Sequence, residues 1–151
     1  MKVVNHKAFT MTELIFVIIV IGILSAIAIP KFAATSVLAR NSKAASELAA
    51  VRSALSAERQ KRILRGDTAA ITSLGNVFTN FSAAADGSTP EVLQYPPTVC
   101  SGSSDKGCWR TEAGTPKPYI YNFADSGDAK FKLENNRLVC NNDASDCAKL
   151  E

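Results

Sequence analysis

The first third of the chain carries one long apolar run. Residues 14–29 contain no charged side chain, and Glu13 is the only charge within residues 9–30. A helix over residues 9–29 would be ~30 Å long, at ~1.5 Å per residue, which is about the thickness of a bilayer core. The pattern therefore predicts a membrane-spanning helix over 9–30.

A second helical pattern follows without a break. Residues 31–65 contain neither Gly nor Pro, and their inward-facing positions recur at alternating spacings of four and three. This pattern predicts an amphipathic helix over 31–65 that ends at Gly66, a residue type suited to the C′ position. The apolar half of the combined helix must then be covered by lipid or by other helices. The seam of inward-facing positions consists of Val37, Asn41, Ala44, Leu48, Val51 and Leu55.

The remaining residues, 66–151, are rich in turns. They hold seven of the eight glycines, five of the six prolines and all four cysteines. We expect a short helix from Asp67 or Thr68 to Leu74 and a loop over 82–90. Strands are expected at 92–95, 119–123, 129–133 and 137–140, the last three as an antiparallel meander. The predicted fold class is α+β, a long N-terminal helix packed on a small antiparallel sheet.

The charge is unevenly distributed along the chain. The formal charge of +3 is too small to indicate nucleic-acid binding by itself, but residues 31–65 are basic and residues 66–151 are acidic. A basic cluster near residue 60 permits two interpretations, a nucleic-acid surface or a helix C-terminus facing an acidic head. We favour the helix end, because no aromatic residue lies within 33–77 to stack on bases. The cluster consists of Arg59, Lys61, Arg62 and Arg65.

The histidine count argues against most familiar enzyme classes. His6 is the only histidine, and it lies ahead of the apolar run. A Ser-His-Asp triad, a Cys-His pair and a histidine metal site all need such a residue inside the folded domain. We therefore expect a protein that is not an enzyme and has no resident cofactor.

A cleaved secretory signal is an alternative interpretation of the N-terminus. Lys2 and Lys7 precede the apolar run, and residues 26–28 have the A-x-A form of a signal-peptidase site. However, the run is longer than the usual ~7–15 residues, and Pro30 follows the site closely. Glu13 lies inside the apolar stretch, where the insertion of a charged side chain costs free energy, up to ~2.5–3.5 kcal/mol at the bilayer centre. These features favour a helix that is retained.

The segment KAFTMTELIFVIIVIGILSAIAIPKF, residues 7–32, resembles the N-terminus of type IV pilins and of the pseudopilins of type II secretion. The resemblance implies a leader peptide over 1–8 that prepilin peptidase removes between Ala8 and Phe9. It also implies N-methylation of Phe9 and a functional role for Glu13, since a glutamate four residues after that phenylalanine is characteristic of the family. The family normally has Gly where this chain has Ala8, so we expect cleavage to be slower than with Gly.

Glu13 also predicts assembly on physical grounds. A carboxylate in lipid needs a cationic partner, and the matured α-amino group of Phe9, in the same or a neighbouring subunit, is the nearest candidate. Such a pair would gain ~4 kcal/mol at ~4 Å and an effective dielectric constant of ~20, before desolvation. The alternative is a glutamate that reaches the headgroup region.

Gly22 and Pro30 bracket a section of weakened helix, because proline donates no hydrogen bond and clashes with the preceding turn. The resemblance implies that subunits loosen this section when they leave the membrane for a filament. An ordinary kink in a membrane helix is an equally good interpretation of Pro30.

The four cysteines predict disulfides, since the membrane segment would place them outside the cytoplasm. Three pairings exist, and we favour Cys100–Cys108 with Cys140–Cys147, because each closes a short polar loop. A zinc site is the disfavoured alternative, since these spacings exceed the usual ~2–4 intervening residues. Trp109 is expected to pack in the core or on a disulfide.

A calcium hypothesis concerns four aspartates in predicted loops. Carboxylates in loops can bind calcium, but no EF-hand pattern is present, and solvated turn residues are the better interpretation. The four are Asp125, Asp128, Asp143 and Asp146.

The resemblance implies a structural subunit of a type IV pilus or a type II secretion pseudopilus, polymerised through its N-terminal helix. It implies an inner-membrane protein with a single span and an external head, which then enters an extracellular or periplasmic filament. Its partners would be identical or related subunits, prepilin peptidase, the inner-membrane assembly machinery and lipid. The alternatives are a membrane-anchored binding module for DNA or a secreted protein, and a periplasmic protein with a cleaved signal.

Overall fold

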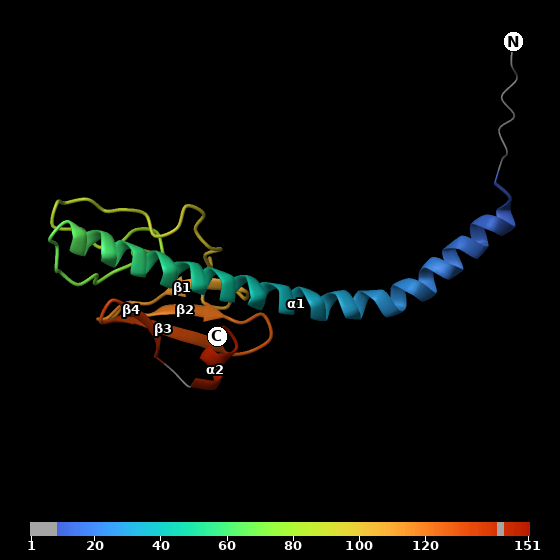
Figure 1. The fold of residues 1–151 in the computed structure, drawn as a ribbon. Coiled ribbons are helices and arrows are strands. Elements are labelled where there is room, and N and C mark those ends of the chain that lie inside the picture. The colour runs from blue at the N-terminus through green and yellow to red at the C-terminus, as the bar shows by residue number, and fades with distance from the viewer. Residues whose placement is uncertain (1–8, 142–143) are drawn as a thin grey trace, which may run out of the picture. The chain divides into compact units, whose positions relative to one another are not determined.

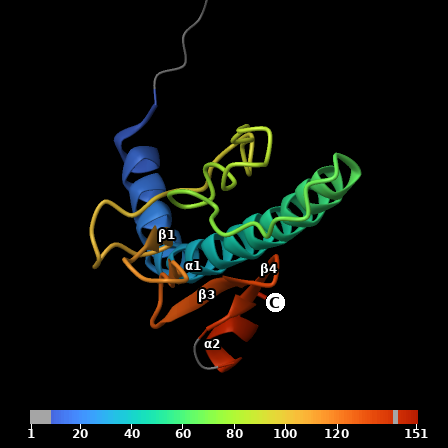
Figure 2. The same ribbon diagram turned by 90° about the vertical axis from the view of Figure 1, so that its left-hand side faces the viewer.

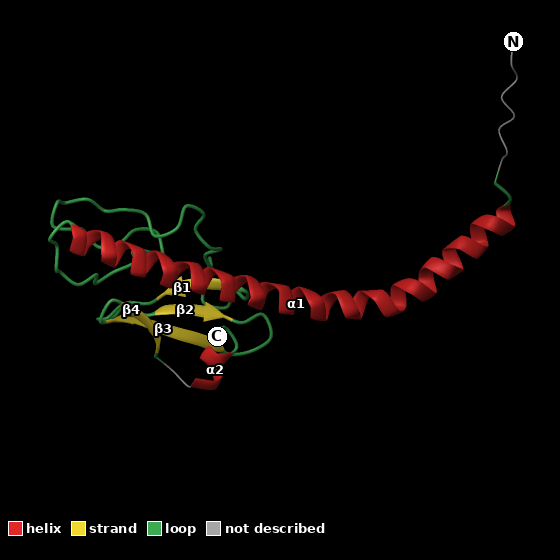
Figure 3. Ribbon diagram, viewed as in Figure 1, coloured by secondary structure: helices red, strands yellow, loops and turns green. Residues whose placement is uncertain are grey.

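The computed structural model describes residues 9–141 and 144–151. The chain forms two units, Met1–Ser36 and Val37–Glu151, and one long helix belongs to both. Figure 3 distinguishes the helices from the strands. The expected α+β class is confirmed. In chain order the elements are α1 (Met11–Leu64), β1 (Cys108–Thr111), β2 (Tyr119–Asn122), β3 (Asp128–Glu134), β4 (Arg137–Cys140) and α2 (Ala144–Ala148).

Helix α1 ends as its sequence predicts. The Gly66 N–H donates to the Ile63 carbonyl at 2.9 Å, and the Asp67 N–H donates to the Arg62 carbonyl at 2.9 Å. This pair of bonds is the Schellman motif, in which the C′ residue adopts a left-handed conformation. Gly66 has a φ of 81°, which glycine adopts without steric strain. The terminal carbonyls are therefore satisfied, and the chain turns away from the helix.

The C-terminal half of α1 packs on the sheet through the predicted seam. Ala44, Leu48, Val51 and Leu55 are at most 2% exposed. Figures 1 and 2 show β3, β4 and α2 on one side of this half of the helix. Burial of each large side chain stabilises the fold by about 1.5–3 kcal/mol. The core that these residues share with the rest of the head includes Ile71, Leu74, Phe78, Trp109, Tyr119, Tyr121, Phe123 and Phe131.

The sheet is an antiparallel meander with the strand order β1-β2-β3-β4. Strand β3 alternates cleanly, with Ala129, Phe131 and Leu133 buried and the residues between them partly exposed. Asn135 and Asn136 connect β3 to β4 with φ values of 51° and 58°, as a two-residue hairpin turn requires. Three of the expected strands are thus confirmed, as β2, β3 and β4.

The strand expected at 92–95 is wrong, and β1 was not anticipated. Glu91 forms one isolated bridge with Asn80, and the Val92 N–H donates to the Thr79 carbonyl, but the pairing goes no further. Two prolines follow at 96 and 97 and supply no N–H to continue a ladder. Strand β1 is only four residues long, and its two apolar residues are adjacent, so the alternation that identifies a half-buried strand is absent.

The short helix expected over 67–74 is also wrong, because its backbone N–H groups bind partners far along the chain. The Ile71 N–H donates to Asn136 Oδ1 at 2.7 Å, and the Leu74 N–H donates to the Tyr119 hydroxyl at 2.8 Å. The segment is irregular. The expected loop over 82–90 is confirmed, whereas helix α2 had no sequence signal strong enough to predict it.

Candidate membrane and assembly segment

The N-terminal part of α1 presents a continuous apolar surface. Every Leu, Ile, Val and Phe within residues 14–29 is exposed, from 37% for Val20 to 69% for Ile29. By length and composition, this stretch is able to cross a membrane, and none of it is buried by the rest of the described chain. The predicted spanning segment is confirmed in that sense. Apolar surface of this extent requires lipid or other protein to cover it.

Glu13 forms a capping box with Thr10 at the start of α1. Glu13 Oε2 accepts hydrogen bonds from the Thr10 N–H at 2.9 Å and from the Thr10 hydroxyl at 2.8 Å. The Thr10 hydroxyl oxygen in turn accepts from the Glu13 N–H at 3.3 Å. Sequence analysis missed this arrangement, although the Thr-x-x-Glu spacing is its known signature. Both donors are neutral, so the bonds fix the carboxylate in place without compensating its charge.

Only the residue after the predicted cleavage site, Phe9, lies within the described part of the chain. Phe9 is 81% exposed, whereas Ala8 and the leader lie outside the described residues. Phe9, Phe16 and Val17 line a shallow hollow together with Glu13. Thr10 and Thr12 also line the hollow, so Glu13 lies among both apolar and hydroxyl side chains.

Gly22 and Pro30 both lie inside the continuous helix α1. A Cβ atom at Gly22 would meet no atom within 4 Å, so nothing in the described chain requires glycine there. Pro30 interrupts the helical hydrogen-bond pattern without ending the helix. Their expected role in loosening the helix stays a prediction.

The structure confirms both predicted disulfides, Cys100–Cys108 and Cys140–Cys147. The first holds the segment before β1 against that strand, where the Cys100 N–H donates to the Trp109 carbonyl at 2.9 Å. The second joins β4 to α2. Each disulfide therefore links a neighbouring segment to one of the two edge strands of the sheet, β1 or β4. Trp109 is 0% exposed and packs in the core, as expected.

Three of the four cations in the basic cluster near residue 60 contact other parts of the chain, whereas Lys61 is exposed. Arg62 is 1% exposed and its Nε lies 2.9 Å from Glu58 Oε1. Arg59 donates to the Ala69 carbonyl at 2.8 Å, and Arg65 pairs with Asp86 at 3.2 Å. These contacts hold the helix end to the loops that follow it and weaken the nucleic-acid interpretation.

Within the described residues, no group of three or more Asp, Glu, His or Cys side chains could hold a metal ion. The aspartates of the calcium hypothesis therefore form no set of calcium ligands there. Asp128 pairs with Lys130 at 3.5 Å, and Asp146 pairs with Lys149 at 3.7 Å. The pKa of Asp125 is lowered chiefly by the backbone N–H of Ser126. Asp143 lies outside the described residues.

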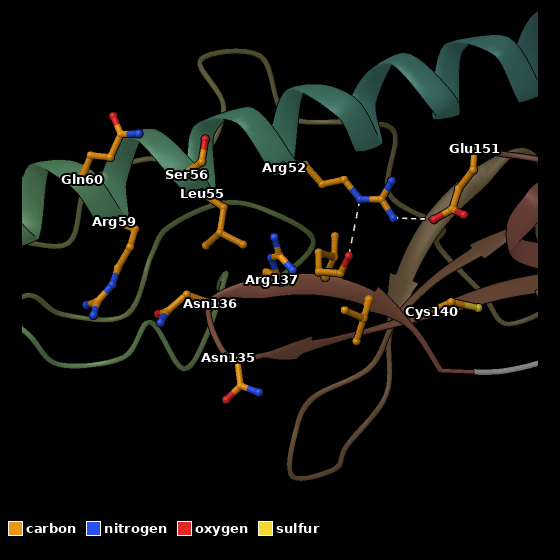
Figure 4. A pocket seen from close by; sticks show the side chains of 12 residues that line it. Arg52, Leu55, Ser56, Arg59, Gln60, Asn135, Asn136, Arg137, Cys140 and Glu151 are labelled. Carbon is orange, nitrogen blue, oxygen red and sulfur yellow. Dashed lines mark hydrogen bonds and ion pairs between the residues drawn. The ribbon is translucent and has the colours of Figure 1, made fainter.

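A groove of about 670 Å³ lies between α1 and β4. Figure 4 shows Arg52 extending from α1 across this groove. Its Nε donates to the Leu138 carbonyl at 3.4 Å, and its Nη2 pairs with Glu151 at 2.6 Å. Arg52 is therefore already paired, and Arg59, which also lines the groove, donates to the Ala69 carbonyl.

Comparison with known proteins finds no relative: no protein-family model, no curated protein and no solved structure matches this chain. Its function is therefore inferred from its own residues.

Proposed function

We propose that this chain is a membrane-anchored structural subunit that is processed at Phe9 and polymerises through its N-terminal helix into a pilus or pseudopilus. The observation that carries the proposal is the fully exposed apolar surface of residues 14–29, which begins directly after one charged residue. Lipid would cover this surface in a lone subunit, and identical helices would cover it in a filament. The resemblance of residues 7–32 to type IV pilins supports the same proposal.

The geometry of Glu13 supports a docking role for its charge. The capping box aims one carboxylate oxygen at Thr10, so the carboxylate lies beside the end of the helix where a matured Phe9 would carry its amine. An amine from a neighbouring subunit would gain charge-assisted hydrogen bonds in a setting of low dielectric constant. Such a contact forms only when two helices lie in one register, so it would select the assembly geometry.

Two roles of Glu13 can be separated by substitution. Glu13→Gln keeps an acceptor for the capping box but removes the charge, whereas Glu13→Leu removes both. Thr10→Val removes the cap and keeps the charge. Membrane insertion should be intact for all three variants, because the two Glu13 variants lose an insertion penalty together with the charge. Thr10→Val keeps the charge and only replaces a polar side chain with an apolar one. If the charge drives assembly, the Gln and Leu variants both lose filaments, Thr10→Val retains them, and Glu13→Asp is intermediate.

The measurement is membrane fractionation combined with the yield of sheared or cross-linked filaments. Normal filament yield for Glu13→Gln would show that the charge is dispensable. A wild-type chain that never forms a homopolymer would favour a minor subunit or the anchored binding module instead.

Intact mass and N-terminal sequencing test the processing step, where the expected result is a chain beginning at N-methylated Phe9. A start at Ile29, or an uncut Met1, would contradict it. Ala8→Gly should speed cleavage if recognition by the peptidase is limiting.

A further inference from the structure

A second cavity, of about 330 Å³, lies within the unit Val37–Glu151 between α1 and the loop that leads into β1. Arg40 and Lys43 line it from α1, and Lys106 lines it from the loop. Trp109 and Tyr121 form its wall on the sheet and are at most 1% exposed. Three cations from two separate elements thus border one cavity with a rigid aromatic wall.

The acid that lines this cavity is already engaged. Glu47 Oε2 accepts a hydrogen bond from Trp109 Nε1 at 2.8 Å, and Glu47 Oε1 lies 3.6 Å from Lys43 Nζ. Among the ion pairs of the described residues, none involves Arg40 or Lys106. Lys43 also donates to the Thr98 hydroxyl at 3.3 Å, and the charge of Lys106 acts on Asp125, which lies outside the lining. The lining itself, with three cations and one acid, still carries excess positive charge that an anion can neutralise.

The loop before β1 closely approaches the exposed Arg40 side chain. A Cβ atom at residue 107 would lie 2.8 Å from Arg40 Cδ, and Gly107 has a φ of 70°. Only glycine fits both constraints, so this loop is shaped to let the Arg40 side chain lie against it. The Tyr121 hydroxyl also donates to the Arg40 carbonyl at 3.1 Å, which anchors the helix backbone at the same place.

We propose that this cavity binds a phosphate group. The Arg40 guanidinium fork and the Lys106 ammonium group, neither of which forms an ion pair among the described residues, match an anion with several oxygens. The volume admits phosphate with a small attached group. The phosphate can come from a phospholipid headgroup or from a free phosphate. Residues 31–43, directly after the apolar run, contain Lys31, Arg40 and Lys43 and no acid, a composition that attracts anionic headgroups. The proposal does not depend on polymerisation.

The single tryptophan of the chain lines this cavity, so its fluorescence reports binding in the full chain in nonionic detergent. Sodium phosphate is titrated at constant ionic strength, and equilibrium dialysis with labelled phosphate measures Kd independently. Arg40→Gln and Lys106→Gln should each raise Kd about tenfold or more, since each removes a charge-assisted bond. Lys61→Gln removes the same charge from an exposed part of α1 and should leave Kd unchanged.

Gly107→Ala tests the positioning of Arg40, because it keeps every charge. Its near-UV circular dichroism should match that of the wild type, while Kd rises severalfold. Unchanged phosphate binding in this variant would show that the position of Arg40 does not matter. An equal rise in Kd for Lys61→Gln would show that net charge alone controls binding. Either result overturns the site as described.

The source of the phosphate is distinguished by competition in doped micelles. Displacement of labelled phosphate by phosphatidylglycerol, but not by a fatty acid of equal charge, identifies the lipid headgroup. Displacement by neither lipid, with saturable binding retained, identifies a free phosphate. Equal displacement by the fatty acid shows that any anion suffices and overturns the proposal, as does saturable binding of neither phosphate nor phosphatidylglycerol.

Discussion

Replacement of Arg62 by Met should destabilise the head by about 3–5 kcal/mol, because it leaves a buried carboxylate without its partner. The Arg62 and Glu58 side chains are 1% and 6% exposed, with Nε 2.9 Å from Oε1. Arg62 Nη2 also donates to the Ser82 carbonyl at 2.5 Å. Methionine occupies much of the aliphatic volume but donates no hydrogen bond. The loss is a large part of a total stability of about 5–15 kcal/mol.

The double variant Glu58→Leu/Arg62→Met removes both charges and should be less destabilised than Arg62→Met alone. A residual loss of about 1–3 kcal/mol is expected, because the Ser82 carbonyl stays without a donor. Urea unfolding of the full chain in detergent, followed by Trp109 fluorescence, measures these differences.

The matched control is Arg65→Met, which breaks the pair with Asp86. Both of these side chains are 52% exposed, so the loss should be below about 1 kcal/mol. The assigned effect of burial would be refuted by a loss for Arg62→Met no larger than that of this control. A double variant at least as destabilised as Arg62→Met alone would refute it as well.

Three further outcomes are expected from the same head. Removing the first disulfide with Cys100→Ser/Cys108→Ser should reduce stability by about 2.5 kcal/mol in the entropic account of loop closure, and urea unfolding with and without reductant checks it. Burial raises the pKa of Tyr119, so its protonated form stabilises the folded chain below a pH of about 10, and this contribution is lost as the pH rises further. Above that pH the urea midpoint should fall less steeply with pH in Tyr119→Phe than in the wild type. Equal pH dependence of the two midpoints would contradict this. Gly66→Ala should destabilise the head by about 1 kcal/mol through its positive φ alone, because a Cβ there meets no atom within 4 Å; a loss several times larger would indicate contacts that the geometry does not contain.

Some features of the chain could be predicted because their causes are local. The apolar run, the alternating seam of α1 and Gly66 depend on side-chain periodicity and on one backbone conformation. The β3–β4 hairpin depends on a two-residue turn of asparagines. The disulfides followed from short loops between cysteines. The capping box of Thr10 and Glu13 was equally local, and its spacing alone was enough to find it.

Other features depended on partners distant in sequence. The amphipathic seam continues past Leu55 to Glu58 and Arg62, at the same spacings of three and four, but charged residues at a helix end are typical of a surface. Only the packed loop, with the Ser82 carbonyl beside Arg62, makes their burial favourable. Asp67 likewise suggested a helix cap, yet its carboxylate accepts from the N–H groups of Ala69 and Ala85. Long-range hydrogen bonds overrode local propensity there.

The cavity bordered by Arg40 and Lys106 shows the same limit for function. Each residue alone is an ordinary surface cation, and no spacing in the sequence connects them. The close approach of the Arg40 side chain to Gly107 and the aromatic wall behind it exist only once the loop packs against α1. The sequence determined the apolar segment, the long helix and three strands of the meander, because repeating side chains and turns act over a few residues. Tertiary structure decided which charges are buried in pairs and which face a cavity, because burial is a property of the assembled core.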